Sequence, residues 1–171
     1  MKVAILTISD AGVRGERADS SGDAAAAWVR EQGGTVTARA MVPDDVGSIV
    51  RQLLAWCDAD DIPLILTTGG TGLSARDVTP EATRVVLERE APGIAERLRA
   101  VTGVDFPRAA LSRGLAGVRG QTLIVNLPGS TSGVTDCLAA FQPIAQHAVD
   151  IVRGAPTEHS PAAPAFDPDT D

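Results

Sequence analysis

A strand-like apolar run ends in three closely spaced glycines, and this loop carries the strongest chemical signal in the sequence. Residues 66–72 read Leu-Thr-Thr-Gly-Gly-Thr-Gly. Glycines let the backbone approach a ligand closely, and successive N–H groups in such a loop can surround an anion. Residues 70–75 also match G-x-G-x-x-A, a dinucleotide-binding pattern, but that pattern must open a helix at once, and the next helix start is at Thr79-Pro80. The loop predicts either a phosphate cradle or an ordinary turn.

Two aspartates close to predicted strand ends are candidates for catalysis. Asp77 follows Arg76, between the glycine loop and the next helix start, and Asp44 follows a second strand that ends at Val42. A carboxylate beside a phosphate cradle is how proteins hold Mg²⁺ against a triphosphate. Each aspartate also has an ordinary alternative: Asp77 as a turn residue, and Asp44 as a helix cap that Asp45 would supply equally well.

Several other chemistries lack the residues they need. Lys2 is the only lysine, which argues against a Walker lysine or a Schiff-base lysine. The segment 129–133 nearly matches a nucleophile elbow, but Thr131 occupies the nucleophile position, and the only histidines are His147 and His159. This spacing does not predict a Ser-His-Asp triad, and too few histidines and cysteines cluster to hold zinc.

Strand-like and helix-like segments alternate along the chain and must position these residues. The patterns predict strands over residues 3–9, 35–42, 62–68 and 121–127, with a polar loop over 9–22. They predict helices over 23–32, from Asp44 or Asp45 to 57, from a Thr79 cap to Pro92-Gly93, over 94–103, and over 134–153 with an interruption at Pro143. Such alternation indicates an α/β fold with a parallel sheet covered on both faces. Ligands bind such sheets beyond the carboxyl ends of the strands, here the loops after Ser9, Val42, Thr68 and Leu127.

Composition indicates one globular domain, with 171 residues of which 44% are hydrophobic and 22% charged. We expect the domain to cover residues 1–153, and residues 154–171, with four prolines and four acids, to form a disordered tail. The net charge of −7 and the absence of tyrosine argue against nucleic-acid binding. The longest apolar runs are too short to cross a membrane. Cys57 and Cys137 form no C-x-x-C pair, which favours a reduced, cytoplasmic setting.

The glycine loop and the segment after it resemble the signature of the molybdopterin adenylyltransferases, which include bacterial Mog proteins and the G domains of plant Cnx and of gephyrin. The resemblance begins with Thr67-Thr68-Gly69-Gly70-Thr71-Gly72 and Arg76-Asp77-Val78-Thr79-Pro80. It extends over nearly the whole chain, through Ile8-Ser9-Asp10, Asp19-Ser20-Ser21-Gly22, Val42-Pro43-Asp44, Leu111-Ser112-Arg113 and Asn126-Leu127-Pro128-Gly129.

This resemblance implies a three-layer α/β/α domain with a mostly parallel sheet that transfers AMP from Mg-ATP to the terminal phosphate of molybdopterin and releases pyrophosphate. It implies a homotrimer, and a molybdenum insertase as a downstream partner. By motif, Asp44 and Asp77 become the catalytic residues and the Mg²⁺ ligands. The implied substrate-binding residues are Ser9, Asp10, Ser21, Thr68, Gly69, Gly70, Thr71, Gly72, Ser112, Arg113, Pro128, Gly129 and Ser130.

The residues after Pro128-Gly129 leave two branches of this family open. The chain continues with Ser130, where active transferases often carry Asn or Gln and the related MoaB proteins also carry Ser. The intact run from Arg76 to Pro80 favours the active branch. The alternatives are a non-catalytic, MoaB-like molybdopterin-binding protein, hexameric by resemblance, and a dinucleotide binder based on residues 70–75.

Overall fold

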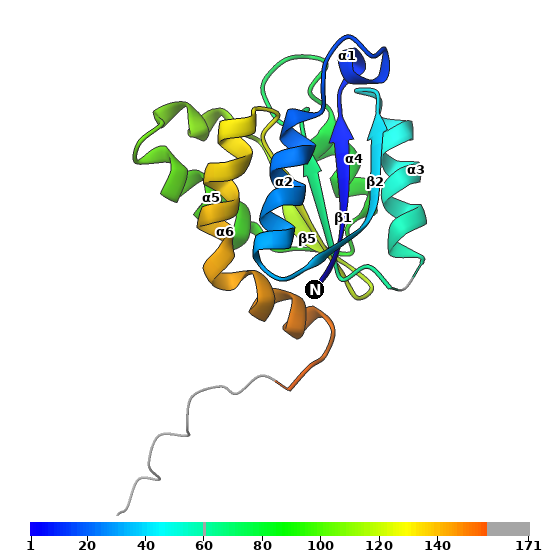
Figure 1. Cartoon of the computed structure of the whole chain (residues 1–171), viewed down its shortest axis with the longest axis vertical. Coiled ribbons are helices and arrows are strands. Elements are labelled where there is room, and N and C mark those ends of the chain that lie inside the picture. The colour runs from blue at the N-terminus through cyan, green and yellow to red at the C-terminus, as the bar shows by residue number, and fades with distance from the viewer. Residues whose placement is uncertain (60, 157–171) are drawn as a thin grey trace, which may run out of the picture.

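The computed structural model describes residues 1–59 and 61–156, which fold around one six-stranded sheet (Figure 1). The strands are β1 (Lys2–Ile8), β2 (Thr35–Val42), β3 (Leu64–Thr68), β4 (Arg89–Glu90), β5 (Ala116–Arg119) and β6 (Thr122–Leu127). The helices are α1 (Asp10–Val13), α2 (Ser20–Glu31), α3 (Val46–Cys57), α4 (Thr79–Val86), α5 (Pro92–Gly103), the 3₁₀ helix η1 (Pro107–Leu111) and α6 (Thr131–Val152). From position 157 onward, the predicted disordered tail lies outside the described residues.

The sheet is mostly parallel, as the alternating pattern predicts. Its strand order is β2-β1-β3-β6-β5-β4, and β1 pairs in parallel with β2 and β3, as β3 does with β6. The carboxyl ends of β1 and β2 therefore point to the same edge, at the top of Figure 1. The register places Ile5 opposite Leu66, and Leu66 opposite Val125, so three fully buried apolar side chains cross the sheet in one row. Buried apolar runs of this kind need helices on both faces.

Helices cover the two faces of the sheet and form two apolar cores. On one face, α2, α5 and α6 pack on alternate strand residues such as Val3 and Ile5. On the other, α3 and α4 pack on Ala4 and Leu6, the residues that alternate with them in sequence. Since side chains along a strand alternate between faces, one apolar strand supplies both cores. The predicted three-layer α/β/α arrangement is confirmed.

The far edge of the sheet differs from the prediction. Strands β4 and β5 were not expected, and both run antiparallel to their neighbours. The helix that starts at Thr79 ends at Val86 rather than at Pro92, because Leu87 has extended backbone angles and leads the chain into β4. Pro92 begins α5 instead, at the first-turn position where a missing N–H costs nothing.

Three helices also differ from the prediction, each for a local reason. Helix α2 begins at Ser20 rather than at 23, because the Asp19 carboxylate accepts a hydrogen bond from the Gly22 N–H. Thr79 is not the cap of α4, since its hydroxyl donates to the Gly69 carbonyl at 2.8 Å. Helix α6 runs unbroken through the exposed Pro143, with buried residues on either side of it holding the helix on the sheet.

Candidate active site

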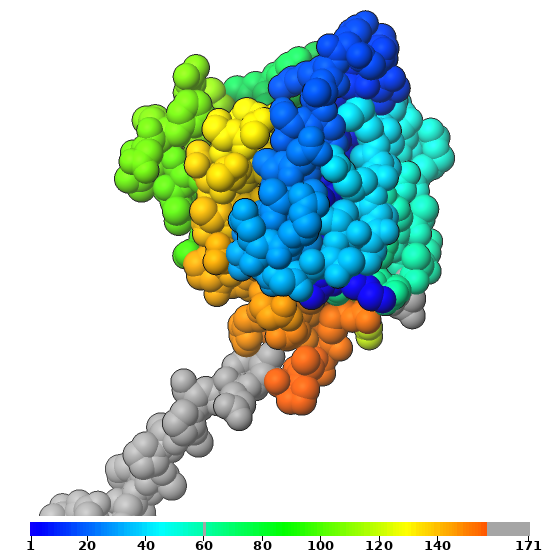
Figure 2. All heavy atoms as spheres, in the orientation of Figure 1, coloured from blue at the N-terminus to red at the C-terminus, as the bar shows by residue number. Residues whose placement is uncertain are grey.

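A cavity of about 570 Å³ opens beyond the carboxyl ends of β1, β3 and β6. Its floor is the glycine loop that follows β3, and the first turns of α2 and α6 form one side. A further part of the wall comes from α5 and η1, the green segment that projects to the left of α6 in Figure 2. The cavity therefore lies where the parallel topology predicts a ligand site.

The glycine loop has a backbone that only glycine adopts readily. Gly69 and Gly70 have φ values of +100° and +62°. A Cβ on Gly69 would lie closer than 3.0 Å to the carbonyl oxygen of Ile8, and one on Gly129 would lie 3.2 Å from the Gly69 Cα. The loop is held from behind, since Thr79 bonds the carbonyls of both Gly69 and Gly70. The end of β1 and the loop after β6 thus pack directly against glycine backbone, and the loop forms part of the cavity wall.

Asp44 lines the cavity and does not cap α3. That cap is Asp45, whose carboxylate accepts from the Ser48 N–H at 2.7 Å. Asp44 instead exchanges two hydrogen bonds with Asp10: its Oδ2 accepts from the Asp10 N–H at 2.8 Å, and its own N–H donates to Asp10 Oδ1 at 3.0 Å. A Cβ on Gly70 would lie 3.2 Å from Asp44 Oδ1, so this oxygen faces the glycine loop.

Asp77 faces the other end of the same loop. Its Oδ2 accepts from the Ser74 N–H at 2.8 Å, and a Cβ on Gly72 would lie 3.0 Å from that oxygen. The adjacent Arg76 reaches across to α1, where its guanidinium donates to Asp10 Oδ2 at 2.5 Å. This hydrogen bond lowers the pKa of the Asp10 carboxyl, so the residue stays ionised. A chain of polar contacts therefore links the two predicted catalytic aspartates.

Two long helices begin at the cavity wall. Ser21 and Asp19 belong to the start of α2, while Ser130 caps α6 and accepts from the Gly133 N–H at 3.2 Å. The Thr131 hydroxyl donates to the Ser20 hydroxyl at 2.8 Å and ties the two helix starts together. Helix N-termini carry partial positive charge and unpaired N–H groups, which suit the phosphate groups of a ligand.

Asp44 and Asp77 supply carboxylate oxygens, the kind of donor that Mg²⁺ prefers. Asp44 and Asp77 each have one oxygen bonded to a backbone N–H and both line the same cavity. Within residues 1–59 and 61–156, no three His, Cys, Asp or Glu side chains are grouped to hold a metal by themselves. Mg²⁺ is usually held by one or two carboxylates, with substrate phosphates and water completing the octahedron. The donors present match that pattern.

Most of the residues predicted to bind substrate line the cavity. They are Ser9, Ser21, Gly69, Gly70, Thr71, Gly72, Ser112, Pro128, Gly129 and Ser130. The other three do not line it. Asp10 contacts Asp44 and Arg76, the buried Thr68 hydroxyl donates to the Pro128 carbonyl at 2.7 Å, and the Arg113 guanidinium donates to the carbonyls of Gly72 and Asp77.

The structure adds cavity residues that the sequence analysis did not identify. Arg17 comes from the loop before α2, Arg99 from α5, and Arg108 from η1, where its guanidinium lies 4.9 Å from the centre of the Phe106 ring. Arg99 and Arg108 place positive charge on the wall that α5 and η1 form. No sequence pattern singles them out, since Arg17 lies in a loop, Arg99 is one of several arginines of a short helix, and η1 has no periodic pattern.

Both cysteines are free thiols in the described part of the chain, and burial raises the pKa of each to about 11. Cys137 lines the cavity, yet its high pKa keeps it protonated at neutral pH. The described part of the cavity therefore offers no thiolate nucleophile. Among the helices of residues 1–59 and 61–156, none has the length and apolarity needed to span a bilayer.

Comparison with known proteins finds relatives whose names concern molybdopterin or the molybdenum cofactor. A family model described as "Probable molybdopterin binding domain" matches residues 4–147. The molybdenum cofactor synthesis protein cinnamon of Drosophila melanogaster is 40% identical over 149 residues, which are 86% of this chain and 25% of that protein. The molybdopterin adenylyltransferase of Helicobacter pylori J99 is 40% identical over 114 residues, 67% of this chain and 65% of that one.

A solved structure of the molybdopterin biosynthesis enzyme MoaB from Thermus thermophilus is also similar, with 50% identity and a TM-score of 0.86. That alignment covers 91% of this chain and 98% of the other. This chain spans 25% of cinnamon and 65% of the H. pylori protein, so the similarity concerns one domain of the longer relative. Because the family model and these relatives match most of the chain, the protein belongs to the molybdopterin-binding family of molybdenum cofactor biosynthesis proteins.

Proposed function

We propose that this protein is a molybdopterin adenylyltransferase that transfers AMP from Mg-ATP to the terminal phosphate of molybdopterin. The observation that carries the proposal is the placing of Asp44 beside Gly70 and of Asp77 beside Gly72 of one glycine loop, in a cavity where two helices begin. This arrangement provides backbone N–H groups for phosphates and two carboxylates for a cation. The relative from H. pylori that bears this name supports the same reaction.

The proposed chemistry needs no nucleophile from the protein. An oxygen of the molybdopterin phosphate attacks the α-phosphorus of ATP, the bond from that phosphorus to the bridging oxygen breaks, and pyrophosphate leaves. When bound, Mg²⁺ would neutralise phosphate charge and would be held by Asp44 and Asp77. The chain itself orients the two anions through the glycine loop and the starts of α2 and α6. A protonated Cys137 and a single lysine at position 2 are compatible with this reaction.

A second function is favoured by one specific observation. The chain is 50% identical to a MoaB protein and carries Pro128-Gly129-Ser130 at the start of α6. A MoaB-like protein would bind molybdopterin in the same cavity without turning over ATP. The intact run from Arg76 to Pro80, which places Asp77 against Gly72, supports the transferase instead.

A pyrophosphate-release assay with molybdopterin and Mg-ATP tests the proposal. Release that depends on all three components is expected. Molybdopterin binding without release would replace the proposal with the MoaB-like function, and NAD binding would support the dinucleotide interpretation of residues 70–75. The last outcome has little structural support, because α4 begins only at Thr79 rather than directly after the glycines.

The proposal also includes the compartment, the oligomeric state and the downstream partner. We place the reaction in the cytoplasm, in line with two unpaired thiols. We propose a homotrimer as the working form, or a hexamer for the MoaB-like alternative, and sedimentation at micromolar concentrations distinguishes these from a 17.6 kDa monomer. The adenylylated product would be consumed by a molybdenum insertase.

A further inference from the structure

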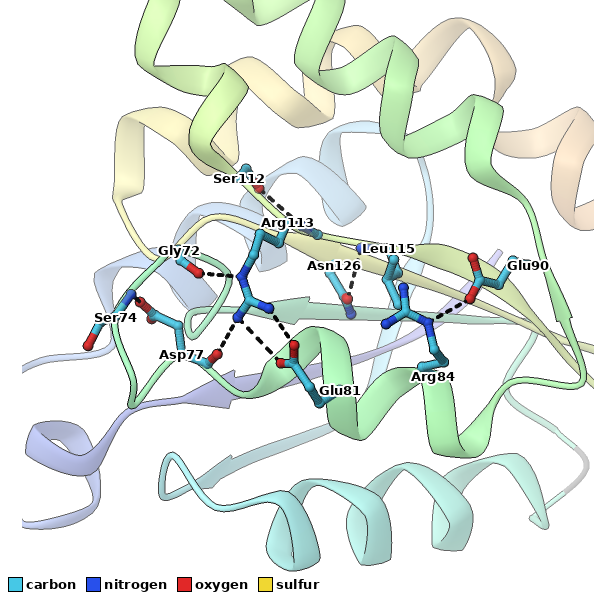
Figure 3. Close-up of polar contacts among 11 residues, drawn as sticks. Gly72, Ser74, Asp77, Glu81, Arg84, Glu90, Ser112, Arg113, Leu115 and Asn126 are labelled. Carbon is cyan, nitrogen blue, oxygen red and sulfur yellow. Dashed lines mark hydrogen bonds and ion pairs between the residues drawn. The ribbon is translucent and has the colours of Figure 1, made fainter.

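Arg113 bonds both ends of the segment that leads from the glycine loop to α4 (Figure 3). Its Nε donates to the Gly72 carbonyl at 2.7 Å, and a terminal nitrogen donates to the Asp77 carbonyl at 2.5 Å. The backbone N–H of the same residue donates to the Thr71 carbonyl at 2.8 Å. One residue therefore spans segment 71–77 from its first residue to its last.

The rest of the guanidinium is bonded to Glu81, in the first turn of α4. Both terminal nitrogens of Arg113 contact this carboxylate, one at 3.4 Å and the other at a shorter distance. These bonds lower the pKa of the Glu81 carboxyl and raise that of the Arg113 guanidinium, so the pair stays ionised. A guanidinium has five N–H groups, and the contacts with Gly72, Asp77 and Glu81 engage four of them. Little donor capacity is left for a substrate anion.

The clamped segment determines where the Asp77 carboxylate lies. Its Oδ2 accepts from the Ser74 N–H inside the segment and lies against Gly72, whose carbonyl is the one that Arg113 holds. Segment 73–76 is otherwise exposed. A loop of this exposure keeps one conformation only where its ends are held, and a planar guanidinium holds two carbonyls in a defined geometry that a lysine ammonium does not reproduce.

We propose that Arg113, held by Glu81, is a positioning residue for Asp77: it fixes segment 71–77 so that the carboxylate faces the cavity beside Gly72. The expected effect on kcat rests on the proposed transferase function. The holding of segment 71–77 by Arg113 does not depend on that function. It assigns Arg113 a role different from the direct substrate contact that the family resemblance implies.

The variant Arg113→Lys tests this assignment because it keeps the positive charge and loses the planar fork. We expect kcat for pyrophosphate release to fall by about 10- to 100-fold while KM for molybdopterin and for Mg-ATP changes less than about twofold, as for misplacement of a reacting group. Hydrogen exchange of amides in segment 71–77 should become at least about tenfold faster. Arg84→Lys is the matched control, since Arg84 lies on α4 as Glu81 does and pairs with Glu90 rather than with segment 71–77 (Figure 3).

Three results would overturn the assignment. A KM that rises at unchanged kcat would show that Arg113 contacts substrate directly. Unchanged amide exchange in segment 71–77 would show that Arg113 does not hold this segment. The same conclusion would follow if Arg84→Lys changed kcat and amide exchange as much as Arg113→Lys does. If Arg113→Lys does not fold, Glu81→Gln takes its place, with the same direction of effect and a smaller size. If the wild-type protein releases no pyrophosphate, the proposed function fails, while the exchange measurement still decides whether Arg113 holds the segment.

Discussion

Replacing Asp77 by asparagine separates its charge from its part in the turn. In the structure, one carboxylate oxygen accepts from the Ser74 N–H at 2.8 Å. An asparagine keeps one oxygen, so it can keep this bond while it removes the negative charge next to Gly72. A hydrogen bond to a charged group contributes about 1.5–3 kcal/mol and one between neutral groups about 1 kcal/mol, so with the bond retained we expect the free energy of unfolding to fall by no more than about 2 kcal/mol.

The effect on the reaction should be much larger. If Asp77 helps to hold Mg²⁺ against the substrate phosphates, its charge acts where negative charge is redistributed in the transition state. Loss of one preorganised polar group at such a place costs about 10²-fold or more in rate, and we expect at least this for Asp77→Asn. Molybdopterin affinity should change much less, because the glycine loop and the helix starts remain.

The assay is pyrophosphate release at saturating Mg-ATP and molybdopterin, combined with thermal unfolding of the same samples. Asp45→Asn is the matched control, because Asp45 makes the same kind of bond to a backbone N–H, at 2.7 Å, but caps α3 outside the cavity. It should transfer AMP at the wild-type rate. An Asp77→Asn protein that also does so would leave Asp77 as a turn residue, and one that fails to fold would move the catalytic assignment to Asp44.

Two further predictions concern the framework of the site. Gly69→Ala should lower the free energy of unfolding by more than about 3 kcal/mol, because φ is +100° and the new Cβ would overlap the Ile8 carbonyl. Gly33→Ala, where φ is +68° and the space around the residue is open, should lower it by only about 1–2 kcal/mol. Thermal unfolding of the two variants measures both losses, and equal losses would contradict the packing argument. The ion pair of Glu81 with Arg113 lowers the pKa of the carboxyl, so its contribution is complete above the ordinary glutamate pKa of about 4.3 and disappears as the pH falls through the lower, folded-state pKa. The stability difference between wild type and Glu81→Gln should therefore shrink from pH 7 to about pH 3, and a difference that grows on acidification would refute this sign.

The sequence alone is sufficient to predict the central strands of the sheet and the kind of site at their ends. The strands near residues 3–9 and 62–68 are evident, because buried parallel strands need near-continuous apolar residues. The edge strand near 35–42 is evident from its alternation of polar and apolar residues instead. The glycine loop is evident for a similar reason, since close packing against Ile8 and Gly129 requires a residue without a side chain. Both are local requirements that appear directly as residue types.

Only the tertiary structure decided which polar side chains enter the cavity. Asp44 and Asp45 are equally good caps by sequence, and Asp45 caps α3 because Asp10, from another strand end, holds Asp44 in a reciprocal pair of hydrogen bonds. Arg113 follows Ser112 in a motif that implies a substrate contact, yet Glu81 and the carbonyls of Gly72 and Asp77 hold its guanidinium, and it does not line the cavity. Long charged side chains have many rotamers of similar energy, so partners distant in sequence decide where each charge lies.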